Sequence, residues 1–232
     1  TLSLLVVAGC AQVATQPDLA VITVIGTNDV HGELVEQTDR GGLTTLSGYV
    51  NAVRKARAED GGLLLVDAGD MWQGTLESNL NEGYSVVEAY NAMGYAAAAI
   101  GNHEFDFGPL GPKSIPESEG DNPFGALQAR ATKANFPLLG ANLIDASTGQ
   151  MVAWDNVQAS TVVQRAGVLI GVIGVLTEST RATTIAANVR DIRITPLAAA
   201  IEEQAQALRL AGWTERQVRR KPVLWVLHAG FA

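Results

Sequence analysis

Four short apolar segments in this chain run directly into polar blocks, and helical periodicity fills most of the sequence between them. The strand-like segments are residues 21–26, 63–66, 96–100 and 223–227. Between the first two, apolar residues recur at helical spacing at Leu43, Leu46, Val50 and Val53. Alternating strands and helices predict an α/β fold, in which the functional crevice lies at the carboxyl ends of the strands. We therefore expect the polar blocks to meet in space.

The remaining elements follow from the same patterns. Helices are expected over residues 43–59, 86–93, 124–134 and 196–210, and further strands over 138–141 and 168–175. Gly94 is expected to end the second helix, because glycine readily adopts the left-handed conformation of a helix terminus. Residues 108–123 hold four of the eight prolines and show no usable period, so they predict a surface loop. Because this loop follows the third polar block, we expect it to shape substrate access.

The polar blocks contain the residue types that bind metal ions. They are Asn28–Gly32, Asp67–Gly74, Gly101–Gly108 and His228–Gly230, and they include all three histidines. Imidazole, carboxylate and amide oxygen are the ligands of Zn²⁺, Mn²⁺ and Fe sites. Asp29 and His31 are two residues apart, so an extended chain would point both side chains to the same side. Taken singly, the same residues also fit ordinary surface, turn-capping or strand-end roles, and only their common placement after strands favours a metal centre.

The third block is the most specific one. Asn102 offers a neutral oxygen ligand, whereas His103, next in sequence, is expected to point away from that ion and stay free for acid–base or electrostatic work. Asp106 lies three residues on, where one turn of chain would bring its carboxylate to His103. Such a carboxylate would orient the imidazole and favour its protonated form. The alternative is a helix N-cap beside a partly buried histidine.

The first twenty residues differ from the rest of the chain. An apolar run over residues 2–8 leads into Gly9 and Cys10, the only cysteine, so that no intrachain disulfide can form. This segment resembles a bacterial lipobox, and its apolar run is too short to cross a bilayer as a helix. Residues 1–20 are therefore expected to be a truncated signal remnant and tether, which implies an exported, periplasmic or cell-envelope lipoprotein. The alternative is a buried first strand that ends in a thiol.

Composition limits the partners. With 232 residues, 47% hydrophobic and 17% charged, the chain suits one globular domain, expected over residues 21–232. The net charge of −8 argues against a nucleic-acid polymer as ligand, since phosphate backbones require clustered Lys and Arg. A small phosphate ester remains possible where metal ions supply local positive charge.

The first three blocks resemble those of the calcineurin-like metallophosphoesterases, and more closely the bacterial 5′-nucleotidase branch. The matching stretches are Asn28–Gly32, Gly-Asp-x-x-Gln-Gly within Asp67–Gly74, and Gly-Asn-His-Glu-Phe-Asp-x-Gly over Gly101–Gly108. The similarity extends over roughly residues 21–230. It implies a metallophosphatase-type α/β/β/α sandwich of two mixed sheets flanked by helices.

The resemblance also implies a role for each site residue. Asp29 and His31 would bind a first ion, Asn102 and His228 a second, and Asp70 would bridge both. His103, supported by Asp106, would face the phosphate. The cofactors would be two divalent ions, Zn, Mn, Co or Fe, with a hydroxide held between them that attacks phosphorus.

Two features of the family pattern have no counterpart before Ala232. These are a Gly-His-x-His block downstream of His228 and a C-terminal substrate domain, so the resemblance implies an incomplete catalytic domain that lacks its C-terminal part. The expected substrates are 5′-nucleotides. The motifs also allow 2′,3′-cyclic nucleotides, nucleotide sugars or thiosulfonate esters, or a non-catalytic metal-binding fragment.

Overall fold

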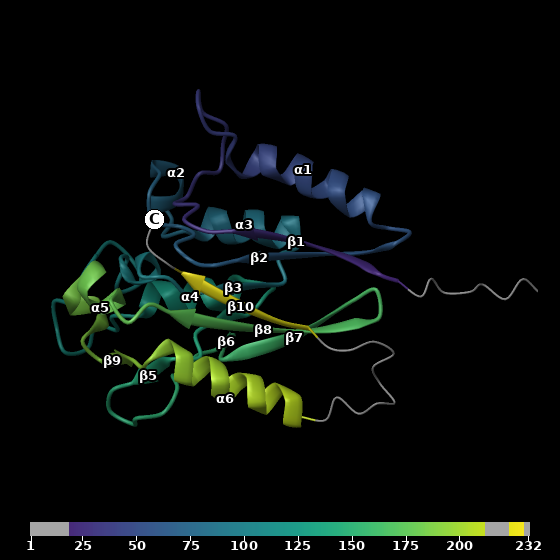
Figure 1. The fold of residues 1–232 in the computed structure, drawn as a ribbon. Coiled ribbons are helices and arrows are strands. Elements are labelled where there is room, and N and C mark those ends of the chain that lie inside the picture. The colour runs from purple at the N-terminus through teal and green to yellow at the C-terminus, as the bar shows by residue number, and fades with distance from the viewer. Residues whose placement is uncertain (1–18, 212–222, 230–232) are drawn as a thin grey trace, which may run out of the picture.

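The computed structural model describes residues 19–211 and 223–229 (Figure 1). One sheet has the strand order β1 (Val21–Thr27), β2 (Gly61–Asp67), β3 (Ala97–Ala99), β4 (Leu138–Leu139) and β6 (Val157–Gln158). A second has the order β10 (Val223–Ala229), β8 (Val168–Leu176) and β7 (Ser160–Arg165). β5 (Leu143–Asp145) pairs separately with β9 (Ile192–Ile194).

The helices connect and cover these strands. They are α1 (Gly42–Ala56), α2 (Leu76–Asn79), α3 (Tyr84–Met93), α4 (Gly125–Lys133), α5 (Thr180–Thr183) and α6 (Leu197–Leu210), with short 3₁₀ turns η1 (His103–Phe105) and η2 (Ala186–Val189). Every pair in the five-stranded sheet is parallel, whereas β8 is parallel to β10 and antiparallel to β7. Parallel neighbours need a crossover, and α1, α3 and α4 supply the first three of them.

Side chains of β2 alternate between two hydrophobic layers. Leu63 and Leu65 pack in a cluster with residues of α1 and α3, such as Val50 and Tyr90. The intervening Leu64 belongs to a different cluster that also contains residues of β8. Since strand side chains alternate in direction, one face of the parallel sheet meets helices and the other meets the second sheet.

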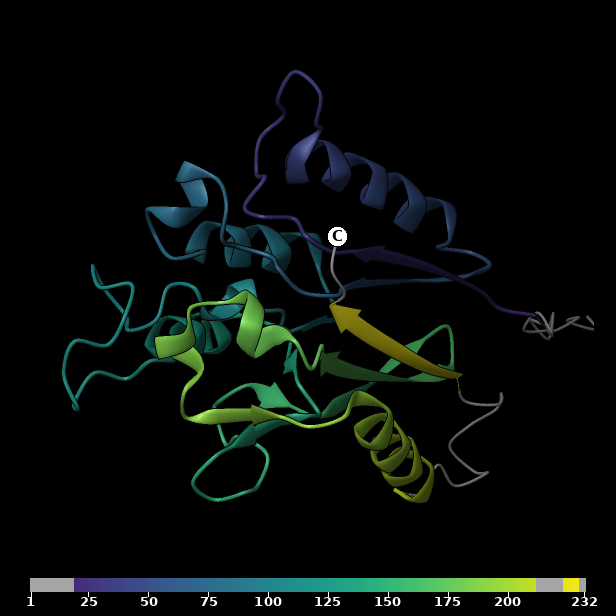
Figure 2. The ribbon, with the colours of Figure 1, turned by 60° about the vertical axis from the view of Figure 1, so that its left-hand side comes forward.

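The opposite face of the second sheet is covered by α6. Ile173 and Val175 of β8 pack against Ala200, Ala205 and Leu208 of that helix. The layers are therefore helix, sheet, sheet and helix, and Figures 1 and 2 show α1 and α6 on opposite outer sides. This confirms the expected α/β/β/α sandwich, in which the five-stranded sheet is parallel throughout its described strands and the other sheet is mixed.

Most elements expected from the sequence are present with shifted ends. Gly94 ends α3 in the left-handed conformation, with φ of 74°, as expected. The segment 108–123 contains no helix or strand, which confirms the loop. The expected lipobox at Cys10 falls outside the described residues. Within the described part of the chain, no helix combines the length and apolar character needed to cross a membrane.

Candidate metal centre

The first two polar blocks lie side by side beyond the ends of β1 and β2. The backbone N–H of Asp29 donates to the Gly69 carbonyl at 3.0 Å, and that of His31 donates to the Asp70 carbonyl at 3.1 Å. Asp29 Oδ1 lies 3.9 Å from His31 Nε2. The two side chains thus converge, as expected, and the loop that follows β1 contacts the loop that follows β2.

A turn, rather than strand alternation, brings Asp29 and His31 together. β1 ends at Thr27, and Asp29 and His31 have φ of 50° and 49°. Left-handed backbone is uncommon for residues other than glycine and requires support from the surrounding structure. The backbone hydrogen bonds to the second block supply that support, so the geometry of the first pair depends on the adjacent loop.

The ring of His31 is oriented by a backbone carbonyl. Nδ1 lies 2.8 Å from the Gln73 carbonyl oxygen. A carbonyl can only accept, so Nδ1 carries the hydrogen and the lone pair of the neutral ring is on Nε2. Imidazoles that bind metals are commonly held by such a contact, so Nε2 is the ring nitrogen of His31 that could bind an ion.

Asp70 joins the second block to the third. Its Oδ1 accepts a hydrogen bond from the backbone N–H of His103 at 2.9 Å. A Cβ at Gly101 would lie 2.2 Å from that oxygen, so only glycine allows this approach. Burial raises the pKa of Asp70, the charge of Asp29 raises it further, and the bond from His103 opposes the shift.

Glu104 is a site residue that the sequence did not reveal. Its buried carboxylate accepts backbone N–H groups from Asp70 at 2.8 Å, Met71 at 2.8 Å and Gly101 at 2.6 Å. Burial, followed by the charge of Asp70, raises the pKa of Glu104 to about 8. Its position inside the third block was the only available signal, because its partners are backbone groups.

Asn102 keeps its side-chain oxygen available. It stands at the N-cap position of η1 but makes no side-chain capping bond. Its Nδ2 instead donates to the Thr183 carbonyl at 3.1 Å, which leaves Oδ1 as the group to be presented to an ion. The Asn102 side chain therefore does not cap the turn, as the helix-cap alternative required.

His103 and Asp106 form the expected pair. Nδ1 of His103 lies 2.6 Å from Asp106 Oδ2, and Asp106 Oδ1 accepts from the Thr184 hydroxyl at 2.7 Å. The bond to Asp106 raises the pKa of His103. The rings of His103 and His31 have centroids 5.0 Å apart and meet edge to face. His103 thus adjoins the first block while its Nε2 is left for a ligand.

His228 lies in β10 opposite Val175 of β8, and β10 contacts β3, the strand that precedes Asn102. Its side chain is outside the described part of the structure. Among the described residues, no three His, Cys, Asp or Glu side chains are grouped closely enough to hold an ion by themselves. The described groups still suit hard or borderline divalent ions, because they combine two carboxylates, an imidazole Nε2 and an amide oxygen.

Proteins of known name are similar to this chain in sequence, although no protein-family model matches it. A 5′-nucleotidase of Vibrio vulnificus is 34% identical over 179 residues, which are 75% of this chain and 29% of that protein. Protein UshA of Yersinia enterocolitica is 37% identical over 162 residues, 68% of this chain and 26% of its own length. The chain therefore spans less than a third of these relatives.

Solved structures agree with the fold. A 5′-nucleotidase precursor from Thermus thermophilus superposes with a TM-score of 0.65 at 28% identity, over 88% of this chain and 36% of that one. The calcineurin-like phosphoesterase YfkN from Bacillus subtilis gives 0.66 at 19% identity, over 88% of this chain and 60% of its own, which supports the fold alone.

The chain is a relative of the 5′-nucleotidases, and its fold is that of a calcineurin-like phosphoesterase. The structure brings Asp29, His31, Asp70 and Asn102 to one edge of the parallel sheet. It places His103 and Asp106 beside them.

Proposed function

We propose that the chain hydrolyses phosphate monoesters, 5′-nucleotides first, with two divalent ions at the three joined blocks. The observation that carries this proposal is the bonding of Asp70 to both neighbours: its carbonyl accepts from His31 and its Oδ1 accepts from His103. Asp70 is thus joined to both the first and the third block, and each of these blocks contains candidate metal ligands. The names of the relatives, 5′-nucleotidase and UshA, support the choice of nucleotides.

In this proposal Asp29 and His31 hold one ion, Asn102 and His228 hold the other, and Asp70 serves both. When bound, such ions lower the pKa of water and neutralise charge on a phosphate. The protein fixes the ligands beforehand: Gln73 orients His31, and Thr183 orients Asn102. Preorganised ligands need no rearrangement when substrate arrives.

His103 is proposed to donate a hydrogen bond from Nε2 to the phosphate as negative charge develops on it. Asp106 accepts the Nδ1 hydrogen and favours the protonated ring, and Thr184 holds the second oxygen of Asp106. A cation fixed next to the reacting phosphate stabilises the transition state more than the ground state.

Product formation from three esters tests the function, each with Mn²⁺ and with excess chelator: adenosine and phosphate from AMP, ring-opened AMP from 2′,3′-cyclic AMP, and UMP with a sugar phosphate from a UDP-sugar. Mn²⁺-dependent hydrolysis that is fastest for AMP is expected. Fastest hydrolysis of either other ester would replace the substrate, while metal binding without turnover would favour the non-catalytic alternative. The comparison should include the 232-residue chain and the protein as its gene encodes it.

The variant Asp106→Asn tests the proposed role of the His103–Asp106 pair. We expect kcat for AMP to fall by about a hundredfold, the lower end of what acid–base and electrostatic groups contribute. Metal affinity should be unchanged, since Asp106 is not a proposed ligand. Asp155→Asn is a matched control: this exposed residue precedes β6, at the end of the parallel sheet opposite to the blocks. Equal activity of the two variants would refute the role of Asp106.

We also propose that the protein is exported and that Cys10 carries a lipid anchor. The support is the apolar run before Gly9 and Cys10, which resembles a lipobox. Intact-mass analysis of the protein from membranes should show a diacylglyceryl addition that Cys10→Ser abolishes. An unmodified Cys10 in the membrane fraction would exclude the anchor.

A further inference from the structure

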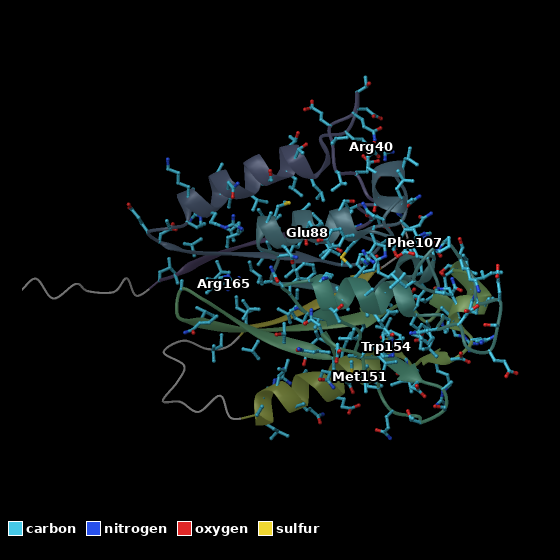
Figure 3. All side chains as sticks on the ribbon, turned by 180° about the vertical axis from the view of Figure 1, so that it is seen from behind. Arg40, Glu88, Phe107, Met151, Trp154 and Arg165 are labelled. Carbon is cyan, nitrogen blue, oxygen red and sulfur yellow. The ribbon has the colours of Figure 1, made fainter. Side chains whose placement is uncertain are left out.

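A cavity of about 470 Å³ lies at the end of the molecule away from the candidate metal centre. It is lined by Arg54 of α1, by Arg165 at the end of β7, by Leu63 near the start of β2 and by the carboxyl-terminal end of α3. The second polar block follows the other end of β2, and Figure 3 shows Arg165 and Phe107, a residue of the third block, at opposite ends of the sheets. This cavity, the Arg54–Arg165 cavity, is therefore separate from the site of the proposed hydrolysis.

Backbone and side-chain oxygens hold both guanidinium groups in place. Nη2 of Arg54 donates to the Met93 carbonyl at 2.6 Å, and its Nη1 donates to Asn51 Oδ1 at 2.7 Å. Nε of Arg165 donates to the Leu63 carbonyl at 2.8 Å, and its Nη1 donates to the carbonyl of the preceding residue at 2.9 Å. A guanidinium carries five N–H donors, so each group has donors beyond the contacts that hold it. Because both side chains are fixed beforehand, binding a ligand costs them little conformational entropy.

The positive charges of this cavity are not balanced by carboxylates within the described part of the chain. Arg57, three residues after Arg54, forms an ion pair with Asp60. Neither Arg54 nor Arg165 has such a partner among the described residues, although the chain carries a net charge of −8. Partial burial, and next the charge of Arg54, lower the pKa of Arg165. The two cations thus repel each other, and a bound anion would offset that repulsion.

The geometry of the lining suits one class of anion. The planar guanidinium matches the oxygens of phosphate, and a phosphate group has enough acceptor oxygens to bond to two guanidiniums at once. Ala92 and Met93 add apolar surface beside the arginines. Ligand pockets commonly enclose about 300–1,000 Å³, so the volume admits a phosphate together with an organic substituent.

The position of the cavity suggests two sources for such a phosphate. Val21, the first residue of β1, pairs with Gly61, two residues before Leu63, so the cavity lies near the end at which β1 begins. The proposed lipid anchor at Cys10 precedes Val21 by eleven residues, which span at most about 40 Å when fully extended. An anchor there would keep this end of the molecule close to lipid headgroups, which are phosphate esters. A soluble phosphate compound is the other source.

We propose that the Arg54–Arg165 cavity is a phosphate-binding site, filled either by a soluble phosphate compound or by the headgroup of an anionic phospholipid. The two guanidinium groups donate hydrogen bonds to the phosphate oxygens, and the negative charge relieves their mutual repulsion. No bond is made or broken at this site. The inference does not rest on the proposed hydrolysis, because none of the lining residues belongs to the candidate metal centre.

Variants with a single arginine replaced test this site. Arg54→Gln and Arg165→Gln each remove one of the two positive charges and leave a side chain that can still donate a hydrogen bond. Arg193→Gln is the matched control, because Arg193 is an exposed residue of β9 that does not line the cavity and has no ion pair among the described residues. The control loses the same charge, so a difference from it depends on position.

Calorimetry with inorganic phosphate measures binding of the soluble source. The 232-residue chain is titrated in excess chelator, so that no ions at the candidate metal centre hold the anion. We expect Arg54→Gln and Arg165→Gln to bind phosphate at least about tenfold more weakly than the unaltered protein, equivalent to about 1.4 kcal/mol. Arg193→Gln should bind phosphate as well as the unaltered protein does.

Sedimentation with vesicles measures binding of the lipid source. Every protein in this experiment also carries Cys10→Ser, so that a covalent anchor does not contribute. The protein should bind vesicles of phosphatidylcholine and phosphatidylglycerol more tightly than vesicles of phosphatidylcholine alone. Arg54→Gln and Arg165→Gln should each weaken that binding by about fivefold, the contribution of one arginine near an anionic surface, whereas Arg193→Gln should not.

The two measurements together decide the proposal. Phosphate binding that depends on Arg54 and Arg165, with no such dependence for vesicles, would identify a soluble ligand, and vesicle binding that depends on them would identify the headgroup. Arginine variants that match Arg193→Gln in both measurements would overturn the site. If Arg165→Gln does not fold, since Arg165 holds the Leu63 carbonyl, the exposed Arg54→Gln decides alone. AMP hydrolysis should be equal in all of these variants, so the proposed function stands or fails separately.

Discussion

Two loops at the same end of this molecule are each organised by one carboxylate, and they differ in how strongly they depend on it. Glu104 accepts three backbone N–H groups in the metal-centre loops and is 1% exposed. Asp121 accepts two backbone N–H groups, from Glu117 and Ser118, and an ion pair from Lys113 in the 108–123 loop. The hydrogen-bond pattern is similar, but only Asp121 has solvent nearby.

The pKa values of the two carboxyl groups move in opposite directions. Burial raises the pKa of Glu104 to about 8, although all three N–H bonds lower it. The N–H of Glu117 and the ammonium of Lys113 lower the pKa of Asp121 to about 2. Hydrogen bonds to a carboxylate favour its charged form, and complete burial outweighs them. The loops of the candidate metal centre therefore rely on a group that water cannot replace, whereas the 108–123 loop does not.

Glu104→Ala should have the largest effect. It leaves three buried N–H groups without acceptors, and at about 1–3 kcal/mol for each we expect a loss of about 5 kcal/mol in unfolding free energy. Urea unfolding measures this loss, with Glu88→Ala, an exposed residue of α3, as control. If the variant does not fold, Glu104→Gln keeps the volume and one acceptor and should show an intermediate loss. Equal stability of Glu104→Ala and Glu88→Ala would contradict the conclusion that the buried Glu104 cannot be replaced by water.

Asp67 extends the comparison to a third carboxylate. It is buried below the second block, where Oδ1 accepts from the Gly69 N–H at 2.7 Å and Oδ2 from the Tyr90 hydroxyl at 2.8 Å. Burial raises its pKa from 3.8 to about 7. The folded state then holds this proton more tightly than the unfolded chain, so its stabilising contribution is complete below 3.8 and is lost as pH rises through about 7.

Asp67→Asn removes this titration. Relative to the variant, the unaltered protein should lose up to about 4 kcal/mol of unfolding free energy between about pH 4 and about pH 7, since one pKa unit is worth about 1.4 kcal/mol. Urea unfolding over that range, in chelator, gives the difference, and contributions from Glu104 cancel because both proteins contain it. Parallel stability profiles would show that burial does not dominate at Asp67.

The sequence predicts those parts of the fold whose signal is contained in one short segment. β2 is recognisable because Leu63–Val66 is continuously apolar, and it is buried on both faces. β7 was missed because Ser160–Arg165 mixes two valines with polar residues and carries no long apolar run. β5 and β9 were missed because each has only three residues and gains its identity from pairing with a distant partner.

The same limit applies to the candidate metal centre. Asp29, His31, Asp70 and Asn102 could be proposed as ligands because their side-chain chemistry is a property of the residue type. The role of Glu104 could not be predicted, because its carboxylate accepts hydrogen bonds from backbone N–H groups more than thirty residues away. Thr184 is further removed still, since its hydroxyl reaches Asp106 across 78 positions of sequence. Long-range contacts of this kind leave no local pattern.

Asp121→Asn should have the smallest effect of these changes. The amide oxygen can still accept the N–H groups of Glu117 and Ser118, and only the ion pair with Lys113 is lost, at a position where water and salt screen it. We expect Tm near neutral pH to fall by no more than about 3 °C. Because the folded pKa is lowered to about 2, this contribution is present above 3.8 and is lost as pH falls through about 2. Thermal scans at about 0.1 M and about 1 M salt should show the difference shrinking as screening increases. Two results would contradict this expectation: a decrease in Tm as large as that of Glu104→Ala, or a decrease that does not respond to salt. Either would mean that Asp121 is as hard for solvent to replace in the 108–123 loop as Glu104 is in the candidate metal centre.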